Sequence, residues 1–246
     1  QEDTEKYLQE RSMRTPPGGW VKFGSSVTEF RTDYADEYPK QFGKYILAVG
    51  TLEPRKNYTT LYDCYKWMLK TYSIEDIPNL VIVGKVSDEW DLVDRISHHP
   101  VLSAKIFIVQ PTDNELRELY VNALFTLLPS LYEGWSLTLP EALNYGKVCI
   151  CSDVRPLREI AEGLVPFVDP ISPVLWGKEI MRLATNPQLV EHYESLIAER
   201  WVNSTWEDCA RMVLEKIDEA CQFSKEITDE DDRYVLPATQ LRENIL

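Results

Sequence analysis

Residues 45–57, YILAVGTLEPRKN, indicate the fold more directly than any other part of the chain. The first five residues are apolar without interruption, a glycine and a proline follow, and the stretch ends on Arg55, Lys56 and Asn57. A short continuous apolar run is typical of a strand buried on both faces of a parallel sheet, while glycine and proline mark a loop. We therefore expect a buried strand that leads into a loop with two adjacent cations, directly ahead of a helix.

The same kind of apolar run recurs along the chain, and amphipathic segments separate the runs. The predicted strands are residues 45–49, 80–83, 106–109, 125–128, 148–151 and 165–168. Apolar residues at helical spacing predict helices at 61–72, 89–97, 113–122, 139–145, 157–161 and 174–185. Such repeated alternation is typical of an α/β fold with a doubly wound, mainly parallel, Rossmann-like sheet.

Two longer helices and two distinct ends complete the chain. The helices are expected at 188–198 and from Ser204 to about Phe223, where Ser204 or Thr205 can cap the start. Apolar residues share one face of the last helix, namely Trp206, Ala210, Val213, Ile217 and Ala220. We expect residues 44–223 to form the α/β domain, 1–43 to be a linker and remnant of a preceding domain, and 224–246 to be an acidic, solvated extension.

The composition argues against several classes of protein. The 246 residues carry a formal net charge of -14, which disfavours a general nucleic-acid binder because such proteins neutralise phosphates with cations. No apolar run approaches the roughly 20 residues of a membrane-spanning helix, and the N-terminus has no signal-peptide centre. The five cysteines form no CxxC pair, which favours reduced thiols in an intracellular protein.

Ligands of an open parallel sheet bind at the carboxyl ends of its strands, so the residues that follow each strand are the first candidates. The first strand leads to Arg55 and Lys56. Arginine can bind phosphate through two parallel N–H groups, and lysine adds a compact point charge. Gly84 follows the second strand and Gln110 the third. Each of these is also compatible with an ordinary surface charge or a common residue at a strand end.

The fourth strand leads into residues 132–143, YEGWSLTLPEAL, which contain Glu133 and Glu141. Thr138 and Glu141 fit a capping box, because a glutamate stands three residues after a threonine at the expected helix start. Glu133 has no such local explanation. Two carboxylates, two cations and a helix N-terminus at one edge of the sheet suit a phosphorylated, polyhydroxylated ligand, because cations and N–H groups bind phosphate and carboxylates accept from sugar hydroxyls.

Other motifs carry less weight. The chain has no GxGxxG and no GxxxxGK[ST], so dinucleotide and P-loop sites have little support. His98 and His99 lie in a polar region and are interpreted as surface residues. Residues 229–231 spell DxD, a metal–nucleotide signature in one class of sugar transferases, but they lie in the acidic extension with no strand before them. We expect no metal and no other cofactor.

Several of these segments resemble one family in their order and spacing. They are YILAVGTLEPRKN, LVIVG, TDNELRELYVNALFTLLPSLYEGWSLTLPEALNYGKVCICSDVRPLREIAE, VDP and NSTW. Together they resemble the C-terminal domain of retaining glycosyltransferases with the GT-B fold, and more closely the group-4 family, which includes bacterial mannosyltransferases. The resemblance covers residues 44–222, about three quarters of the chain.

The resemblance implies a site for a nucleotide-sugar donor. Glu133 and Glu141 resemble the two glutamates of the family's E-x7-E motif, the first beside the donor sugar near its anomeric carbon, the second on the ribose. Arg55 and Lys56 would hold the diphosphate and stabilise its growing charge without a metal. The other residues expected to line the donor pocket are Gly50, Thr51, Gly84, Gln110, Gly134, Trp135, Ser136 and Leu137.

Three positions depart from the family's pattern. Many members have an arginine where Thr51 stands, a glycine where Ser136 stands and a glycine where Val109 stands. Diphosphate binding remains expected, whereas the base and the sugar stay open. The GTLEPRKN and YEGW forms resemble members that use GDP-mannose or related GDP-sugars, so a GDP-sugar is favoured over a UDP-sugar.

The resemblance also implies what lies outside the matched region. In the family, a second Rossmann-like domain precedes this one and brings acceptor-binding groups, and residues 1–43 are too short to be that domain. We expect the donor-binding half of a hexosyltransferase that acts on a glycan or lipid-linked acceptor, in the cytoplasm or at the inner face of the membrane. The alternatives are a non-catalytic nucleotide-sugar-binding module of a polysaccharide synthase and, less favoured, a sugar-nucleotide epimerase.

Overall fold

The computed structural model describes residues 2–11, 19, 21–25, 37–87 and 91–226. The chain divides into two compact units, which are residues 25–203 and a smaller unit of residues 1–24 with 204–246. The smaller unit contains helices α1 (Glu2–Glu10) and α10 (Trp206–Glu226), and all the strands lie in the larger unit.

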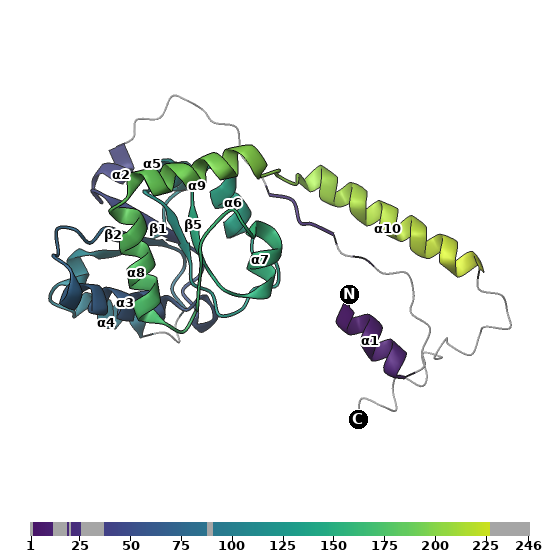
Figure 1. The fold of residues 1–246 in the computed structure, drawn as a ribbon, viewed down its shortest axis with the longest axis horizontal. Coiled ribbons are helices and arrows are strands. Elements are labelled where there is room, and N and C mark those ends of the chain that lie inside the picture. The colour runs from purple at the N-terminus through teal and green to yellow at the C-terminus, as the bar shows by residue number, and fades with distance from the viewer. Residues whose placement is uncertain (1, 12–18, 20, 26–36, 88–90, 227–246) are drawn as a thin grey trace. The chain divides into compact units, whose positions relative to one another are not determined.

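A six-stranded sheet forms the centre of the larger unit (Figure 1). Its strands are β1 (Tyr45–Val49), β2 (Asn79–Val83), β3 (Ile106–Val109), β4 (Thr126–Leu128), β5 (Cys149–Ser152) and β6 (Phe167–Val168). They lie in the order β3-β2-β1-β4-β5-β6, and every neighbouring pair is parallel. The predicted doubly wound parallel sheet is confirmed. The largest boundary error is at β6, which begins only after Pro166, a residue with no N–H to donate to a neighbouring strand.

Helices and short turns connect the strands. They are α2 (Glu37–Lys40), η1 (Pro54–Lys56), α3 (Tyr58–Thr71), α4 (Leu92–Ser97), η2 (Leu102–Ala104), α5 (Asp113–Asn122), α6 (Thr138–Asn144), α7 (Arg155–Ala161), α8 (Pro173–Ala184) and α9 (Pro187–Arg200). All the predicted helices are present, with boundaries that shift by up to three residues. The expected start of α4 at residue 89 lies outside the described residues.

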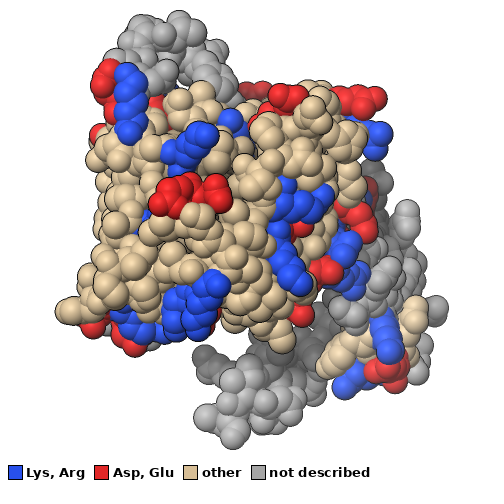
Figure 2. All heavy atoms as spheres, turned by 60° about the vertical axis from the view of Figure 1, so that its left-hand side comes forward, with Lys and Arg blue, Asp and Glu red and all other residues tan. Residues whose placement is uncertain are grey.

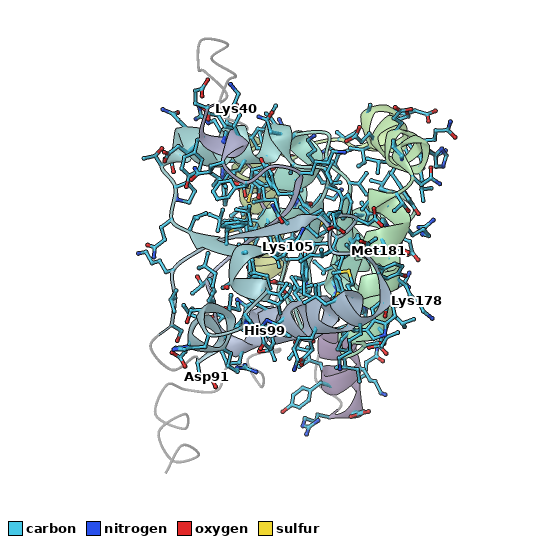
Figure 3. The ribbon with its side chains drawn as sticks, turned by 90° about the vertical axis from the view of Figure 1, so that its left-hand side faces the viewer. Lys40, Asp91, His99, Lys105, Lys178 and Met181 are labelled. Atoms are coloured by element: carbon cyan, nitrogen blue, oxygen red, sulfur yellow. The ribbon has the colours of Figure 1, made fainter. Side chains whose placement is uncertain are left out.

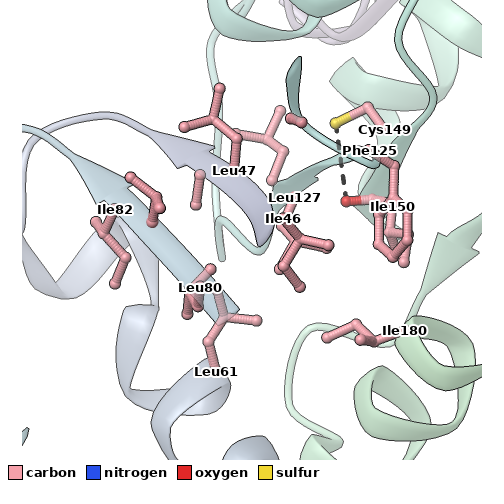
Figure 4. Packing of buried hydrophobic residues seen from close by; sticks show 14 of the residues in the cluster. Ile46, Leu47, Leu61, Leu80, Ile82, Phe125, Leu127, Cys149, Ile150 and Ile180 are labelled. Atoms are coloured by element: carbon pink, nitrogen blue, oxygen red, sulfur yellow. Dashed lines mark hydrogen bonds between the residues drawn. The ribbon is translucent and has the colours of Figure 1, made fainter. Parts of the chain in front are cut away.

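The core lies between the sheet and the helices that cover it. Figure 4 shows Leu61 of α3 and Ile180 of α8 among the side chains of the central strands, and both are completely buried. Helices α3 and α8 pack closely because residue 177 is a glycine. A Cβ atom on Gly177 would lie 2.5 Å from the ring of Trp67, too close unless the ring or the helix shifts.

The surface carries charges of both signs. Figure 2 shows lysine and arginine side chains interspersed with aspartate and glutamate on one face, and pairs such as Arg182–Glu179 at 2.6 Å join neighbouring turns of a helix. Lys105, at the start of β3 (Figure 3), donates to the Ile77 carbonyl at 2.8 Å, and burial lowers the pKa of this amine. Arg182 and Lys105 therefore serve local contacts.

The two neighbouring histidines have structural surroundings. His98 is exposed, as predicted for a surface residue. His99 (Figure 3) is half-buried, and its Nδ1 accepts the backbone N–H of Leu102 at 3.1 Å. All five cysteines are free thiols in the structure.

In the smaller unit, α10 begins at a capping box. Thr205 Oγ1 accepts the N–H of Asp208 at 3.0 Å, and the Asp208 carboxylate accepts the N–H of Thr205 at 3.1 Å, which confirms Thr205 as the cap. The helix continues to Glu226, three residues further than predicted. Val213 and Ile217, on its expected apolar face, are 41% and 51% exposed. The expected domain of residues 44–223 would include most of α10, whereas the division of the chain into compact units places α10 in the smaller unit. The expected domain boundaries therefore stay a prediction.

Within the described ranges, no helix combines the length and the apolar composition that crossing a bilayer requires.

Candidate functional site

The sheet order determines where a ligand can bind. The chain runs from β1 outward to β2 and β3 on one side, and then crosses back to β4 on the other side of β1. The loops that follow β1 and β4 therefore both start at the carboxyl ends of neighbouring strands, but they lead away in opposite directions. The place where the strand order reverses in this way is the topological switch point, and open α/β sheets bind ligands in the crevice there. Residues 50–57 and 129–137 are these two loops.

A single buried carboxylate joins the two loops. Glu133, after β4, is 4% exposed. Its Oε1 accepts from Lys56 Nζ and from Ser130 Oγ, each at 2.6 Å, and its Oε2 accepts from Arg55 Nη1 at 3.0 Å. The structure therefore brings together Arg55, Lys56 and Glu133, three of the residues that the sequence singles out. The contribution of Ser130 was not found from the sequence, although its position three residues before Glu133 was visible.

These contacts decide the charge state of Glu133. Burial acts to raise the pKa of its carboxyl group, but the hydrogen bonds from Lys56 and Ser130 and the charges of Lys56 and Arg55 outweigh it, so the pKa lies below its usual range. Glu133 is therefore ionised at neutral pH. A carboxylate in this state can serve as a fixed negative charge at the site.

Arg55 is shared between several partners. Its Nη1 also donates to the Tyr132 carbonyl at 3.1 Å, and its Nη2 donates to Glu53 Oε1 at 2.6 Å. The Arg55–Glu53 pair is open to solvent, with side-chain exposures of 42% and 35%, whereas Lys56 is only 11% exposed. The two adjacent cations thus differ in burial, because Lys56 is held in the interior and Arg55 lies at the surface of the site.

Asn57 fixes the end of the first loop. It stands at the cap position of α3, but its side chain makes no capping hydrogen bond to that helix. Instead Nδ2 donates to the Pro129 carbonyl at 2.9 Å and to the Pro170 carbonyl at 2.8 Å, with the backbone at φ 58°. Asparagine is among the few residues that adopt this left-handed conformation at low cost. Asn57 therefore joins the loops that follow β1, β4 and β6.

The structure corrects the interpretation of Glu141. The predicted capping box with Thr138 is absent, because the residue at the cap position is Leu137 and no side chain caps α6. Instead, Glu141 Oε2 accepts from the hydroxyl of Tyr120 on α5 at 3.0 Å. The carboxylate turns away from its own helix terminus because a buried hydroxyl from another helix is available. Burial raises the pKa of Glu141 above its usual range.

Ser136 has an unusual conformation and environment. Its backbone has φ 73°, the left-handed region that favours glycine. The residue is 8% exposed, and its Oγ is buried without a hydrogen-bond partner among the described residues. Next to it Gly134 lies in the open, since a Cβ there would meet no atom within 4 Å, while Leu137 is half-exposed and Trp135 is partly buried. The departure at Ser136 therefore leaves strain in the loop.

The two glycines at the ends of β1 and β2 have a packing role. A Cβ atom on Gly84 would lie 2.0 Å from the carbonyl oxygen of Gly50, and Gly50 itself donates to the Val83 carbonyl at 2.8 Å. A glycine at 84 is thus required for the close approach of two backbones, whatever binds nearby. Thr51 is exposed next to them, and Gln110 is exposed at the end of the edge strand β3.

In the part of the chain that the structure describes, no three His, Cys, Asp or Glu side chains gather in a way that could hold a metal ion. The DxD triplet at 229–231 lies outside the described residues.

The match to known proteins accords with this geometry. Residues 31–199 match the family described as glycosyl transferases group 1. The chain belongs to this family. The matched residues include β1 to β6 and both loops of the site. The match therefore supports the expectation that the chain is the C-terminal domain of a glycosyltransferase with the GT-B fold.

Bacterial mannosyltransferases are among the proteins that resemble this chain in sequence. The O-antigen chain mannosyltransferase B of Escherichia coli is 30% identical over 138 residues, which are 54% of this chain and 35% of that protein. The serotype-specific mannosyltransferase WbdA of Escherichia coli is 34% identical over 177 residues, 70% of this chain and 20% of that protein. The matched part therefore spans well under half the length of these relatives.

A solved structure supports the fold. The N-terminal domain of Candida albicans trehalose-6-phosphate phosphatase superposes on 77% of this chain with a TM-score of 0.64 and 14% sequence identity, and the match covers 46% of that domain's chain. At this identity the likeness concerns the fold alone.

We predict that the buried carboxylate stabilises the fold. Glu133→Ala should lower the free energy of unfolding by about 3–5 kcal/mol, because it leaves the Lys56 charge buried without its partner. Glu53→Ala, which breaks only the exposed pair, should cost no more than about 1 kcal/mol. Urea denaturation followed by circular dichroism measures both. Equal losses in the two variants would contradict a special role for Glu133.

The stability that Glu133 contributes should depend on pH. Because folding lowers the pKa of Glu133, the stability that it contributes is fully present above the pKa of the unfolded chain and is lost as the pH falls through the lower, folded pKa. The difference between wild type and Glu133→Ala should therefore shrink on acidification.

We also predict that Ser136 destabilises the protein. Ser136→Gly should raise the free energy of unfolding by about 1 kcal/mol, because glycine relieves the left-handed strain and removes a buried hydroxyl without a partner. In a chain of this size that corresponds to a rise in Tm of about 2–4 °C. Ser136→Ala removes the hydroxyl alone and should give a smaller gain. A fall in Tm for the glycine variant, measured by calorimetry, would contradict the prediction.

Proposed function

We propose that this chain is the donor-binding domain of a retaining glycosyltransferase and binds a nucleotide-diphosphate sugar at the switch point of its sheet. The observation that carries the proposal is the cluster of Arg55, Lys56 and Glu133 in a member of the glycosyl transferases group 1 family. A GDP-sugar, and GDP-mannose in particular, is favoured by the mannosyltransferase names of its relatives. The sugar would pass to a glycan or lipid-linked acceptor.

The ion pairs of the site suggest which cation binds the diphosphate. In the structure, Lys56 pairs with Glu133, and Arg55 pairs with both Glu133 and Glu53. An exposed pair such as Arg55–Glu53 contributes about 0–1 kcal/mol, so a phosphate can replace Glu53 at little cost. Separating Lys56 from the buried Glu133 costs several times more, on the order of 3–5 kcal/mol. Arg55 is therefore the diphosphate-binding residue in this proposal, and Lys56 keeps Glu133 ionised and fixed.

Charge complementarity gives this arrangement a catalytic use. As the glycosidic bond breaks, negative charge develops on the nucleoside diphosphate, and a preorganised cation stabilises that charge more in the transition state than in the ground state. Arg55 would supply this stabilisation without a metal ion. Glu133 would lie beside the donor sugar, where its negative charge can stabilise the positive charge that grows at the anomeric carbon.

The remaining roles concern recognition. Glu141 would accept hydrogen bonds from the ribose hydroxyls, and the backbone N–H groups of residues 135–137 would meet the sugar and diphosphate. Gly50, Thr51, Gly84 and Gln110 would line the same pocket. Because the matched region spans only part of its relatives, we place acceptor recognition in a second domain of the full-length protein, which would act in the cytoplasm or at the inner face of the membrane.

A second candidate function is favoured by one observation. Ser136 stands in a strained conformation with a buried hydroxyl that lacks a partner, as in a donor loop that has been altered. A non-catalytic module that binds a nucleotide sugar within a polysaccharide synthase would tolerate such a change. In the full-length protein, donor binding without sugar transfer would favour this alternative.

We predict selective nucleotide binding. Isothermal titration should show binding of GDP and GDP-mannose, weaker binding of UDP, and the same affinity for GDP in the presence of EDTA. Glu141→Gln should weaken GDP binding about 10-fold, because a neutral amide accepts ribose hydroxyls less strongly than a carboxylate. The absence of binding by GDP, UDP and GDP-mannose would overturn the proposal.

A second prediction separates the cations. Glu53→Gln should raise the affinity for GDP several-fold, because it releases Arg55 from a competing carboxylate, while Arg55→Gln should lower the affinity about 10-fold. In the double variant, the benefit of Glu53→Gln should vanish, since the two residues act on the same phosphate contact. Unchanged or weaker GDP binding by Glu53→Gln would contradict the assignment of Arg55.

A further inference from the structure

The hydroxyl of Tyr120 is a buried donor at the edge of the site. Tyr120 lies in the last turns of α5, is 1% exposed, and donates to Glu141 Oε2 at 3.0 Å. This is the only hydrogen bond that the Glu141 side chain makes among the described residues, and no lysine or arginine there pairs with it. Glu141 itself is partly exposed. One carboxylate oxygen of Glu141 is therefore held by Tyr120, and the other makes no hydrogen bond among the described residues.

The position of this hydroxyl is fixed by packing. The ring of Tyr120 stacks on the ring of Tyr145, with centroids 4.8 Å apart and an angle of 8° between the planes. At the end of α5, the hydroxyl of Tyr45 in β1 donates to the Leu119 carbonyl at 2.8 Å. At its start, Thr112 and Glu115 form a capping box. Helix α5 is thus capped at its start and tied to β1 near its end, and the ring stack with Tyr145 limits the freedom of Tyr120 to follow Glu141.

The charges around the carboxylate make this hydrogen bond important. Burial raises the pKa of Glu141, and the bond from Tyr120 opposes that rise. The other titratable groups that face the pair are Tyr145, Cys149 of β5 and, through Tyr145, Arg117 of α5. Burial and the Glu141 charge raise the pKa of Tyr120 well above its usual range, so its hydroxyl stays protonated. Tyr120 is therefore the group that compensates for the desolvation of Glu141.

We propose that Tyr120 is a positioning residue for nucleotide binding: its hydroxyl holds one oxygen of the Glu141 carboxylate, so that the other oxygen accepts hydrogen bonds from the hydroxyl groups of a ribose. This inference rests on the proposed function, in which Glu141 contacts the nucleotide. Tyr120 does not touch the nucleotide itself. It acts through the orientation and the protonation state of the carboxylate.

The proposal predicts how acid affects binding. The ionised carboxylate is the stronger acceptor, so nucleotide affinity is present above the folded pKa of Glu141 and declines as the pH falls through it. Tyr120→Phe keeps the ring stack but removes the donor that favours the ionised form. The pKa of Glu141 then rises further, and the loss of affinity on acidification begins at a higher pH. A purely structural role for Tyr120 would leave this profile in place.

The experiment measures GDP affinity by isothermal titration between about pH 5 and about pH 8. Tyr120→Phe should bind GDP about 10-fold more weakly at neutral pH, the size expected for the loss of one hydrogen bond to a charged group, and its decline should move to higher pH. In Glu141→Gln only the decline that comes from protonation of the terminal phosphate of GDP should remain, and adding Tyr120→Phe to that variant should have no further effect.

Tyr65→Phe is the matched control. Tyr65 on α3 is completely buried, and its hydroxyl donates to the Pro78 carbonyl at 3.0 Å, so its removal also deletes one buried hydrogen bond. Tyr65→Phe should lower Tm about as much as Tyr120→Phe and leave GDP affinity and its pH profile unchanged. If wild type binds GDP and Tyr120→Phe keeps both the affinity and the profile of wild type, the inference is overturned while the proposed function stands. If wild type binds no nucleotide, both are overturned.

A second measurement does not depend on the folding of Tyr120→Phe. In protein labelled with 3-fluorotyrosine, the fluorine resonance of Tyr120 should shift when GDP binds and should titrate with Glu141 on acidification. Glu141→Gln should abolish that titration. A Tyr120 resonance that responds neither to GDP nor to pH in the wild-type chain would contradict the positioning role.

Discussion

The carboxylate of Glu133 is the interaction on which the site depends. It lies almost completely buried between the loops that follow β1 and β4, and it is shared by Lys56, Ser130 and Arg55. An isolated buried charge is strongly unfavourable, so the two loops must stay together for Glu133 to remain ionised in the interior. The parallel order of the sheet makes that possible, because β1 and β4 are neighbours whose carboxyl ends lie at the same edge.

The site also shows how two acids of one short segment acquire different properties. Glu133 meets two cations and a hydroxyl, which keep its pKa low despite burial. Glu141, eight residues further along the chain, meets a single hydroxyl, and burial raises its pKa. Environment rather than residue type separates them. The fixed charge of Glu133 is suited to the reacting centre of a ligand. Glu141, whose protonation is more easily perturbed, is suited to recognising hydroxyl groups elsewhere on the ligand.

The sequence predicted the parts of the molecule that depend on periodicity. Continuous apolar runs such as residues 45–49 were found because a strand buried on both faces leaves no polar positions. The meeting of Arg55 and Lys56 with Glu133 followed from the topology. The partners of Glu141 could not be predicted, because the hydroxyl of Tyr120 arrives from another helix and outweighs a good local capping pattern. At position 136 the sequence showed only a serine where many members of the family have a glycine. The backbone strain could not be predicted, because the φ angle depends on the path of the whole loop.

Asn57 extends these connections across the sheet. Its side-chain amide binds carbonyls at Pro129 and Pro170, so the loop after β6 is tied to the same point as the loops after β1 and β4. Local opening of a protein usually releases contiguous groups of contacts together. Hydrogen exchange in these three loops is therefore expected to be concerted, although nearly half the chain separates them. The site would be protected from solvent, and exposed to it, as one cooperative unit.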